Sequence, residues 1–354
     1  MQIFKSTLSG DNTGKEKLCS INFIRVLCAI GIVFYHVSSH IALTGNNYFL
    51  NYANGNFGEL FVGIFLLISG GVLYYNHPRI DSLKAFYFKR WKAIFPMFYI
   101  TWFYYYLDSA VSFKSPFYKG VPAIFLSIFG VDGYFNYRFE TYYKIGEWFF
   151  GALVFMYLLY PLFTFIVNKL RLWVLVALIP LWIWQVSTDI FIIPDTINLI
   201  NVSLLFISGM LIFKYRIYEN LIVKILSPVI SLCLLLIPIK INTIYTNYLT
   251  VVFLFISLYT LGEFITKNKL ITRFLNFAGN YTLPIYLLQN TTSFSLNYYL
   301  KPESFKAFLF TAILVLCICA LHSWYLTAIV KAVYNTKWFK KIEEFFMRKK
   351  IKEK

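Results

Sequence analysis

Long apolar runs, separated by short polar or basic segments, recur along almost the entire chain. A helix needs about 20 mostly apolar residues to cross the hydrocarbon core of a bilayer, and many of the runs approach that length. The pattern therefore predicts an all-α fold, a polytopic transmembrane helical bundle of about ten spans. The expected spans are residues 19–41, 58–75, 94–111, 147–167, 173–187, 197–213, 222–239, 245–265, 283–299 and 305–333.

The polar segments divide the chain into a lead at residues 1–18, a membrane domain at 19–333 and a basic tail at 334–354. The tail places Trp338, Phe339 and further aromatic residues between lysines. This pattern is typical of an amphipathic helix lying on an anionic cytoplasmic leaflet. Residues 82–92 similarly alternate apolar and aromatic side chains with lysines, which predicts an interfacial helix before the third span. Pro96 is then expected in the first turn of that span.

The composition excludes a soluble domain, because 59% of the residues are hydrophobic and only 14% are charged. The formal charge of +17 can indicate a nucleic-acid partner, but the lysines and arginines lie in short clusters between apolar runs and in the tail. Five of these cations fall within residues 79–92, so the positive-inside rule places this loop and both termini in the cytoplasm. We expect a multi-pass plasma-membrane protein that contacts lipid and binds no nucleic acid.

The five cysteines lie mostly inside predicted spans and lack the spacing of a zinc site. We infer neither a disulfide framework nor a structural metal. His36 and His40 are one turn apart in the first span, and such a pair can contribute to a metal site. No carboxylate or third histidine accompanies them in that span, so the sequence predicts no bound metal.

The first predicted span carries two residues that are costly inside a membrane, Arg25 and His36. At roughly 100° per residue, their separation places both side chains on one helix face, roughly 16 Å apart along the axis. A cation near one membrane surface and an imidazole toward the other suit an anionic compound that enters on one side and reacts deeper in. We expect both to face a common interior channel. The structural alternative is that Arg25 reaches the headgroups and His36 is a hydrogen-bonded core histidine.

Three further places bring polar groups to the membrane or its edge. Arg90 and Lys92 belong to a cationic cluster that either marks topology or binds the phosphates of a nucleotide-type donor. Glu147 and Trp148 either hold a sugar ring or form a helix cap and part of the interfacial aromatic belt. Gln289 lies in an unusually polar ninth span, which is expected to kink at the proline near its start.

These residues resemble motifs of the integral-membrane acyltransferase 3 family. The first-helix motif of that family is a basic residue, ten residues and a histidine, which Arg25 and His36 match. The second-helix signature, Phe-Phe followed by a residue or two and Ser-Gly, is similar to residues 65–70, with leucine for the second phenylalanine. The third-helix pattern Arg-x-x-Arg-Ile-x-Pro resembles residues 90–96, with Ala93 in place of the second arginine.

Two later segments extend the resemblance. Residues 147–161 are similar to the aromatic entry of the fourth helix of the family. Residues 282–289 resemble the pattern Ser-Tyr-x-Ile-Tyr-Leu-x-His, with Thr282 for serine and Gln289 for histidine. The motifs occur in the order of the family and cover most of the chain.

The resemblance implies a membrane O-acyltransferase that moves an acetyl or other short acyl group from a cytoplasmic acyl-CoA to a hydroxyl of an extracytoplasmic or lipid-linked sugar. Acyl-CoA, with acetyl-CoA as first choice, is then a co-substrate, and no cofactor is bound. Catalysis is expected from His36, as general base or transient acyl carrier, together with Arg25. Donor binding is expected at Arg90, Lys92 and Ser69, and acceptor binding at Glu147, Trp148 and Gln289. Other glycan-synthesis proteins are candidate partners.

Two other functions fit the same pattern. A transporter or export component for a polysaccharide or lipid-linked oligosaccharide could use Arg25 as a charge in its transport site. A membrane scaffold for glycan-synthesis enzymes would instead tolerate alanine at both Arg25 and His36. Loss of all surface polymer on gene deletion favours transport, whereas intact polymer without acyl esters favours the enzyme.

Overall fold

The computed structural model describes residues 12–42, 48–112, 114, 120–142, 145, 147–188 and 191–347, and within them all side chains except those of residues 12–18, 42, 108, 112 and 147. The helices are α1 (Asn12–Ala42), α2 (Phe57–Asn76), α3 (Leu83–Ser112), α4 (Val121–Ile128), α5 (Asp132–Phe135), α6 (Glu147–Leu170), α7 (Trp173–Ser187), α8 (Leu199–Lys214), the 3₁₀ helix η1 (Ile217–Glu219), α9 (Leu221–Leu236), α10 (Thr243–Ile265), α11 (Lys269–Ala278), α12 (Thr282–Leu300), α13 (Phe305–Asn335) and α14 (Lys337–Met347). A short antiparallel hairpin pairs β1 (Asn51–Tyr52) with β2 (Gly55–Asn56).

The all-α prediction is confirmed, and a helix occupies each of the ten predicted span positions. Within the described residues, five helical segments are long and apolar enough to cross a membrane. They are Cys19–Ile41, Phe57–Asn76, Trp148–Leu170, Thr243–Ile265 and Phe305–Asn335. Because α7, α8 and α9 are apolar but shorter, and α3 and α12 are more polar, the count of ten spans stays a prediction.

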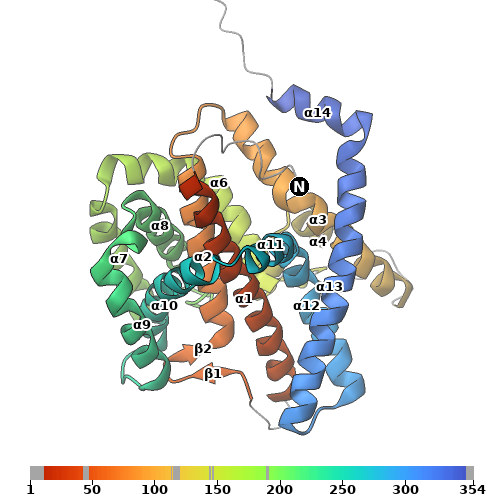
Figure 1. Ribbon diagram of the computed structural model, residues 1–354. Coiled ribbons are helices and arrows are strands. Elements are labelled where there is room, and N and C mark those ends of the chain that lie inside the picture. The colour runs from red at the N-terminus through yellow and green to blue at the C-terminus, as the bar shows by residue number, and fades with distance from the viewer. Residues whose placement is uncertain are drawn as a thin grey trace, which may run out of the picture.

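The first helix runs through the middle of the bundle and packs against α2, α10, α11, α12 and α13 (Figure 1). The helices α7, α8 and α9 lie to one side of α1 in this view, whereas α12 and α13 lie to the other. The β1–β2 hairpin is at the lower end and α14 at the upper end, and we name the two ends of the bundle after them. Ser38 accepts a hydrogen bond from the backbone N–H of Phe49, beside the hairpin. His36 is therefore nearer the hairpin end and Arg25 nearer the α14 end.

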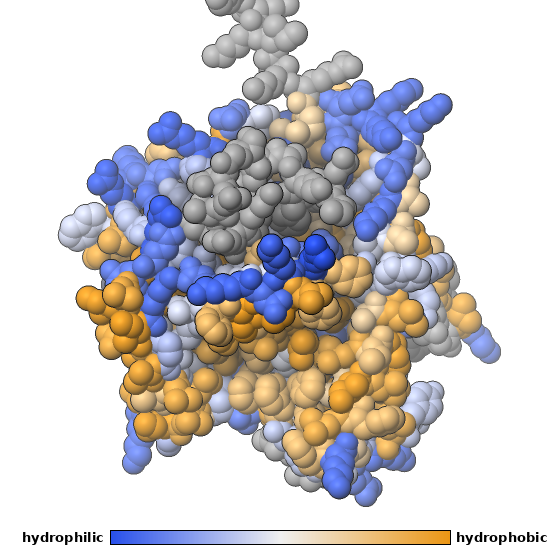
Figure 2. Space-filling view, viewed as in Figure 1, coloured by the Kyte–Doolittle hydropathy of each residue, from blue (hydrophilic) through white to orange (hydrophobic). Residues whose placement is uncertain are grey.

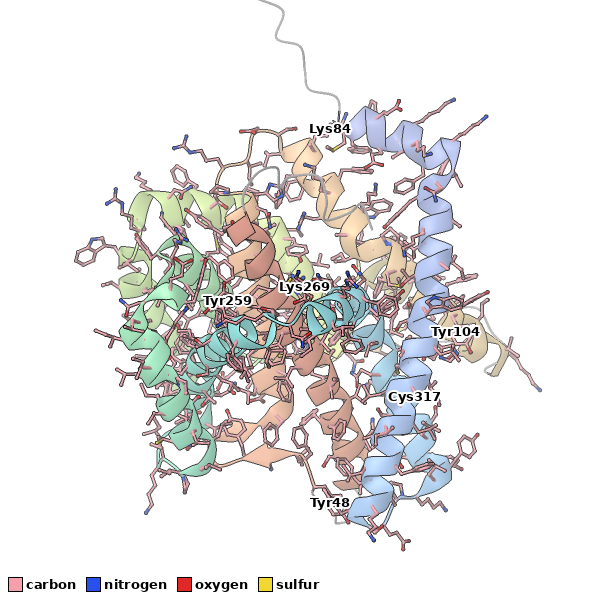
Figure 3. The ribbon with its side chains drawn as sticks, viewed as in Figure 1. Tyr48, Lys84, Tyr104, Tyr259, Lys269 and Cys317 are labelled. Atoms are coloured by element: carbon pink, nitrogen blue, oxygen red, sulfur yellow. The ribbon has the colours of Figure 1, made fainter. Side chains whose placement is uncertain are left out.

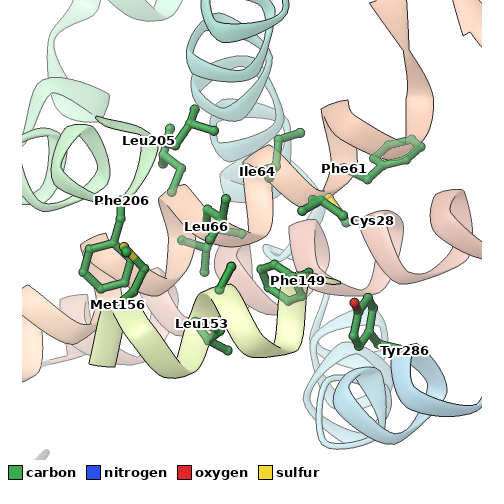
Figure 4. Close-up of a cluster of buried hydrophobic side chains, with 14 of the residues drawn as sticks. Cys28, Phe61, Ile64, Leu66, Phe149, Leu153, Met156, Leu205, Phe206 and Tyr286 are labelled. Atoms are coloured by element: carbon green, nitrogen blue, oxygen red, sulfur yellow. The ribbon is translucent and has the colours of Figure 1, made fainter. Parts of the chain in front are cut away.

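Two glycines allow α2 and α8 to approach each other closely. A Cβ at Gly70 would lie 2.0 Å from the carbonyl oxygen of Phe206, and one at Gly209 would lie 2.0 Å from the carbonyl oxygen of Leu67. Small residues at helix crossings are typical of membrane bundles, because they bring two backbones into contact. Large buried side chains fill the space beside the crossing (Figure 4). The Ser-Gly pair of the second helix thus has a packing role.

We expect Gly70→Ala to destabilise the fold strongly, because the neighbouring atom is backbone and cannot rotate away. Overpacking typically costs about 1–3 kcal/mol, and a 2.0 Å approach to a carbonyl oxygen lies at the upper end. Thermal unfolding of the purified protein in detergent measures the loss. Gly262→Ala is the matched control, since its new Cβ would meet its nearest neighbours at 3.1 Å. Equal melting temperatures for the two variants would contradict the packing role of Gly70.

The expected break between residues 82–92 and 94–111 is wrong, because α3 is continuous and Pro96 lies inside it. A proline has no N–H for the carbonyl four residues earlier, which here belongs to Lys92. The Tyr334 hydroxyl of α13 donates to that carbonyl instead. A neighbouring helix therefore satisfies the group that the proline leaves free, and α3 can continue. In α12, Pro284 lies in the first turn, where the missing N–H has no helical partner in any case, so the predicted kink has no cause there.

The tail forms the predicted helix, α14, but part of its aromatic face packs against protein. Phe339 is only 2% exposed, and Phe346 stacks on Phe88 of α3 with ring centroids 4.7 Å apart. Lys84 of α3 lies 3.5 Å from the ring centre of Phe345 (Figure 3). Trp338 on the other side is 63% exposed. Membrane contact of the tail stays a prediction for this outer face.

Large apolar side chains are exposed over much of the bundle surface. In Figure 2, apolar side chains cover much of the middle and lower part of the visible face, and hydrophilic ones gather toward the α14 end. Leu221 and Leu236 of α9 and Leu321 of α13 are each about two-thirds exposed. Such a surface is suited to lipid rather than to water. The structure therefore indicates a membrane protein.

Candidate functional site

Four polar residues from four helices meet at the level of Arg25. Arg25 of α1 and Arg90 of α3 both lie within electrostatic range of Tyr157 of α6, whose hydroxyl also interacts with the side chain of Ser69 of α2. The Arg90 guanidinium carbon is 5.9 Å from the centre of the Tyr157 ring. Ser69 donates a hydrogen bond of 2.7 Å to the carbonyl of Phe65. We call Arg25, Ser69, Arg90 and Tyr157 the arginine cluster.

The two arginines of this cluster carry positive charge without a carboxylate partner among the described side chains. The ion pairs seen there join other residues, and the Nε of Arg90 is buried without a hydrogen-bond partner within the described chain. Uncompensated guanidinium groups are costly in surroundings of low dielectric. Planar N–H donors of this kind pair well with phosphate oxygens. The cluster can therefore hold an anion.

His77 lies beside the arginine cluster, at the end of α2. Burial, together with the nearby Arg90 and Lys89 charges, lowers the pKa of this imidazole to about 4. His77 is thus neutral at physiological pH, chiefly because it is buried, and the Arg90 and Lys89 charges act in the same direction. The Lys89 charge beside His77 adds to the attraction of an anion toward Arg90.

Lys92, predicted to share in donor binding with Arg90, points to a different partner. Its Nζ forms an ion pair of 2.6 Å with Glu343 of α14 and lies 5.0 Å from the ring centre of Tyr334. Residues two apart on a helix face different directions, so Arg90 faces α6 while Lys92 faces the tail. The structure therefore brings together Arg25, Arg90 and Ser69, but not Lys92.

His36 lines a pocket of about 150 Å³ nearer the hairpin end of the bundle. The lining residues come from α1, β2, α2, α6, α12 and the segment between α7 and α8. They are Ile32, Tyr35, His36, Asn56, Gly58, Glu59, Val62, Trp148, Thr196 and Tyr286. An imidazole that lines a cavity can reach a bound molecule, as a general base must. We call this cavity the histidine pocket.

Trp148, predicted to bind the acceptor, lines the histidine pocket together with a carboxylate from another helix. Glu59 of α2 lines the same pocket, whereas the side chain of Glu147 lies outside the described residues. Asn56 caps α2 by accepting from the N–H of Glu59 at 2.8 Å. Sequence reasoning overlooked Glu59, although a carboxylate just inside a predicted span is the same signal that drew attention to Arg25.

Gln289 lies outside the histidine pocket, deep in the bundle. It is fully buried, and neither polar atom of its amide has a partner within the described residues. Tyr286, one turn away on α12, is the residue of that helix that lines the pocket. The structure therefore brings together His36, Trp148 and Glu59, and places Gln289 behind Tyr286.

The expected single channel from Arg25 to His36 is not seen in the lining of the histidine pocket, which lacks Arg25. Phe65 and Phe149 lie at the level between the two sites, with ring centroids 6.1 Å apart. Phe149 also contacts Tyr286, at 5.2 Å (Figure 4). Phe65 thus lies between the arginine cluster and the histidine pocket along α2, in contact with Phe149.

His40 lies one turn beyond His36 and binds a neighbour. Its Nε2 is 3.0 Å from Oδ1 of Asn290 on α12. The ring centroids of His36 and His40 are 6.3 Å apart. The part of the chain that the structure describes contains no group of three or more metal-ligating side chains. His40 therefore helps to join α1 to α12.

Comparison with known proteins supplies the family. A family model described as an acyltransferase domain matches residues 19–328, which include both the arginine cluster and the histidine pocket. No curated protein and no solved structure matches the chain. The match spans most of the sequence and agrees with the motifs around Arg25, Ser69 and Arg90. The chain therefore belongs to the acyltransferase 3 family and is a membrane acyltransferase.

Proposed function

We propose that the protein transfers an acetyl or other short acyl group from a cytoplasmic acyl-CoA to a hydroxyl of an extracytoplasmic or lipid-linked sugar. The observation that carries this proposal is the placement of two unlike sites on one helix. Arg25 lies in a cluster suited to an anion, and His36 lines a pocket nearer the other end of the same helix. An acyl-CoA has its phosphates far from its thioester, so it suits two such sites.

The donor phosphates would bind at the α14 end of the bundle. We propose that this end faces the cytoplasm, that the protein lies in the plasma membrane and that both termini are cytoplasmic. Arg25 and Arg90 supply the guanidinium groups, and Tyr157 and Ser69 supply hydroxyls. Lys92 holds α14 against α3 through Glu343, so its contribution to the donor site is to support the segment that carries Arg90. Acyl-CoA in this scheme is a co-substrate that leaves as free CoA.

The chemical step would take place in the histidine pocket. His36 removes the proton from the acceptor hydroxyl while the hydroxyl oxygen attacks the thioester carbonyl. The new ester C–O bond forms, the C–S bond breaks, and the proton held by His36 passes to the leaving thiolate. Protons and electrons balance without a further reactant. General base catalysis by an imidazole typically contributes about 10² to 10⁴-fold to the rate.

The donor can deliver its thioester to the pocket only if the aromatic rings between the two sites move apart. Phe149 contacts Phe65 on one side and Tyr286 on the other. Exposed or loosely held side chains change rotamer rapidly, whereas a substrate-driven opening of packed rings is slower. The closed arrangement would limit the passage of water between the two sites until the donor is bound.

Reconstitution of the purified protein in lipid vesicles tests the proposal directly. Vesicles with acetyl-CoA on the α14 side and a sugar glycoside on the other side should give a sugar ester and free CoA, detected by mass spectrometry. Movement of the unmodified glycoside across the bilayer, without ester formation, would instead favour the export function. If the vesicles showed neither ester formation nor movement of the glycoside, both the acyltransferase and the export assignments would be contradicted.

A further inference from the structure

The histidine pocket contains a carboxylate, Glu59, that no cation of the described residues neutralises. Glu59 is partly buried, and its side chain interacts with Asn56. Within the described chain, no lysine or arginine lines the pocket or forms an ion pair with Glu59. A carboxylate at this depth is costly unless hydrogen-bond donors surround it. A ligand that brings donors would supply what the pocket lacks.

An indole ring faces the same cavity from a different helix. Trp148 of α6 and Glu59 of α2 both line the pocket, so a ligand between them meets an apolar face and a charged acceptor at once. A sugar ring has these two complementary surfaces: a face of C–H groups and a rim of hydroxyl donors. Hydrogen bonds from hydroxyls to a carboxylate are among the stronger neutral-to-charged pairs.

Resting on the acyl transfer proposed above, we propose that the sugar unit that enters the histidine pocket is an uncharged ring. Its hydroxyls donate to Glu59, its apolar face lies on Trp148, and the hydroxyl to be acylated points to His36. Sugars that carry a carboxylate or a phosphate are rejected, because their charge would approach Glu59 with no cation between them. Rejection by like charge is a common means of specificity at buried sites.

A purely structural role for Glu59 makes a different prediction. Glu59 follows the N-cap Asn56 by three residues, and a carboxylate in the first turn stabilises a helix. If that were its only role, Glu59→Gln would change the melting temperature but leave the preference among sugars unchanged. The ratio of two acceptors therefore separates recognition from helix capping.

The experiment compares two acceptors that differ in one group, a methyl glucoside and the corresponding glucuronide, with acetyl-CoA as donor. We expect the wild-type protein to favour the neutral glycoside in kcat/KM by about tenfold or more. Glu59→Gln, which keeps the size and hydrogen-bonding atoms of the side chain, should lower that ratio about tenfold, chiefly through a gain on the glucuronide. Glu303→Gln removes an equal charge from an exposed loop at the hairpin end and should leave the ratio unchanged.

Direct binding of both sugars to the purified protein, measured by calorimetry, provides a second readout that does not depend on turnover. Equal kcat/KM or equal affinity for the two sugars in the wild type would overturn the inference while leaving the acyltransferase assignment intact. An unchanged ratio in Glu59→Gln would also overturn it. Failure to acylate either sugar, with tight and selective binding of the neutral one, would contradict the proposed reaction but support the charge preference.

Discussion

Replacement of His36 by alanine is expected to lower kcat for acyl transfer by about 10² to 10⁴-fold, the usual contribution of a positioned general base. The imidazole lines the pocket in which the acceptor hydroxyl would lie, so alanine removes the proton acceptor. The KM for acyl-CoA should change little, because the arginine cluster that would bind the phosphates is about three helical turns away. Release of CoA from acetyl-CoA, followed in vesicles with a saturating glycoside, measures both constants.

His40→Ala is the matched control for this experiment. His40 lies one turn farther along α1, does not line the pocket and binds Asn290. Its removal should reduce stability slightly and retain most of the activity. If His36→Ala were as active as His40→Ala at the same level of folded protein, His36 would have no part in the chemistry. The surface glycan of cells that express each variant should show the same difference in ester content.

Arg25→Met is expected to raise the KM for acyl-CoA by about 10 to 100-fold, the equivalent of losing one or two charge-assisted hydrogen bonds to phosphate. Methionine has a similar length and no charge, so the surrounding helices can keep their packing. Because Arg25 shares its site with Arg90 and has no carboxylate partner within the described chain, removing its charge should leave thermal stability equal or higher. Titration of activity against acetyl-CoA and thermal unfolding test both parts.

A structural role for Arg25 would produce the opposite pattern, with a lower melting temperature and an unchanged KM. Arg273→Met is the control, since Arg273 is an exposed cation of α11. Arg273→Met should change neither the KM for acyl-CoA nor the melting temperature. Arg25→Lys should recover part of the donor affinity, because it restores the charge without the planar pair of donors that matches a phosphate.

The sequence predicted the helices well because their cause is local. An apolar run of sufficient length forms a helix in a membrane whatever surrounds it, since every backbone group must be hydrogen-bonded within the segment. The same argument identified Arg25 and His36, because a charged or titratable residue stands out against such a run. It did not predict that α3 continues through Pro96, since the Tyr334 hydroxyl that compensates for the missing hydrogen bond is 242 residues from Lys92 in the sequence.

The candidate site likewise combines features that the sequence predicted with features that depend on contacts between distant residues. The resemblance assigned Ser69, Arg90 and Lys92 to donor binding and Arg25 to catalysis with His36, whereas the structure groups Arg25, Ser69 and Arg90 around Tyr157. Glu147 next to Trp148 suggested a sugar site, and this stays a prediction because the side chain of Glu147 lies outside the described residues; the structure adds Glu59 of α2, which lines the pocket with Trp148. Likewise Lys92, two residues from Arg90, pairs with Glu343.

The sequence by itself determined the class of this protein, a helical membrane protein of the acyltransferase 3 family, and the two residues of α1 most costly to bury. Hydrophobicity and helix period are properties of a single segment, so they can be read without knowing its neighbours. Tertiary structure alone decided that Glu59 lines a pocket with His36, that Lys92 pairs with Glu343 of α14 and that Phe149 contacts both Phe65 and Tyr286. These depend on how α2, α3, α6 and α12 are rotated against α1, and close contacts such as that of Gly31 of α1 with the Phe61 ring of α2 restrict such rotations.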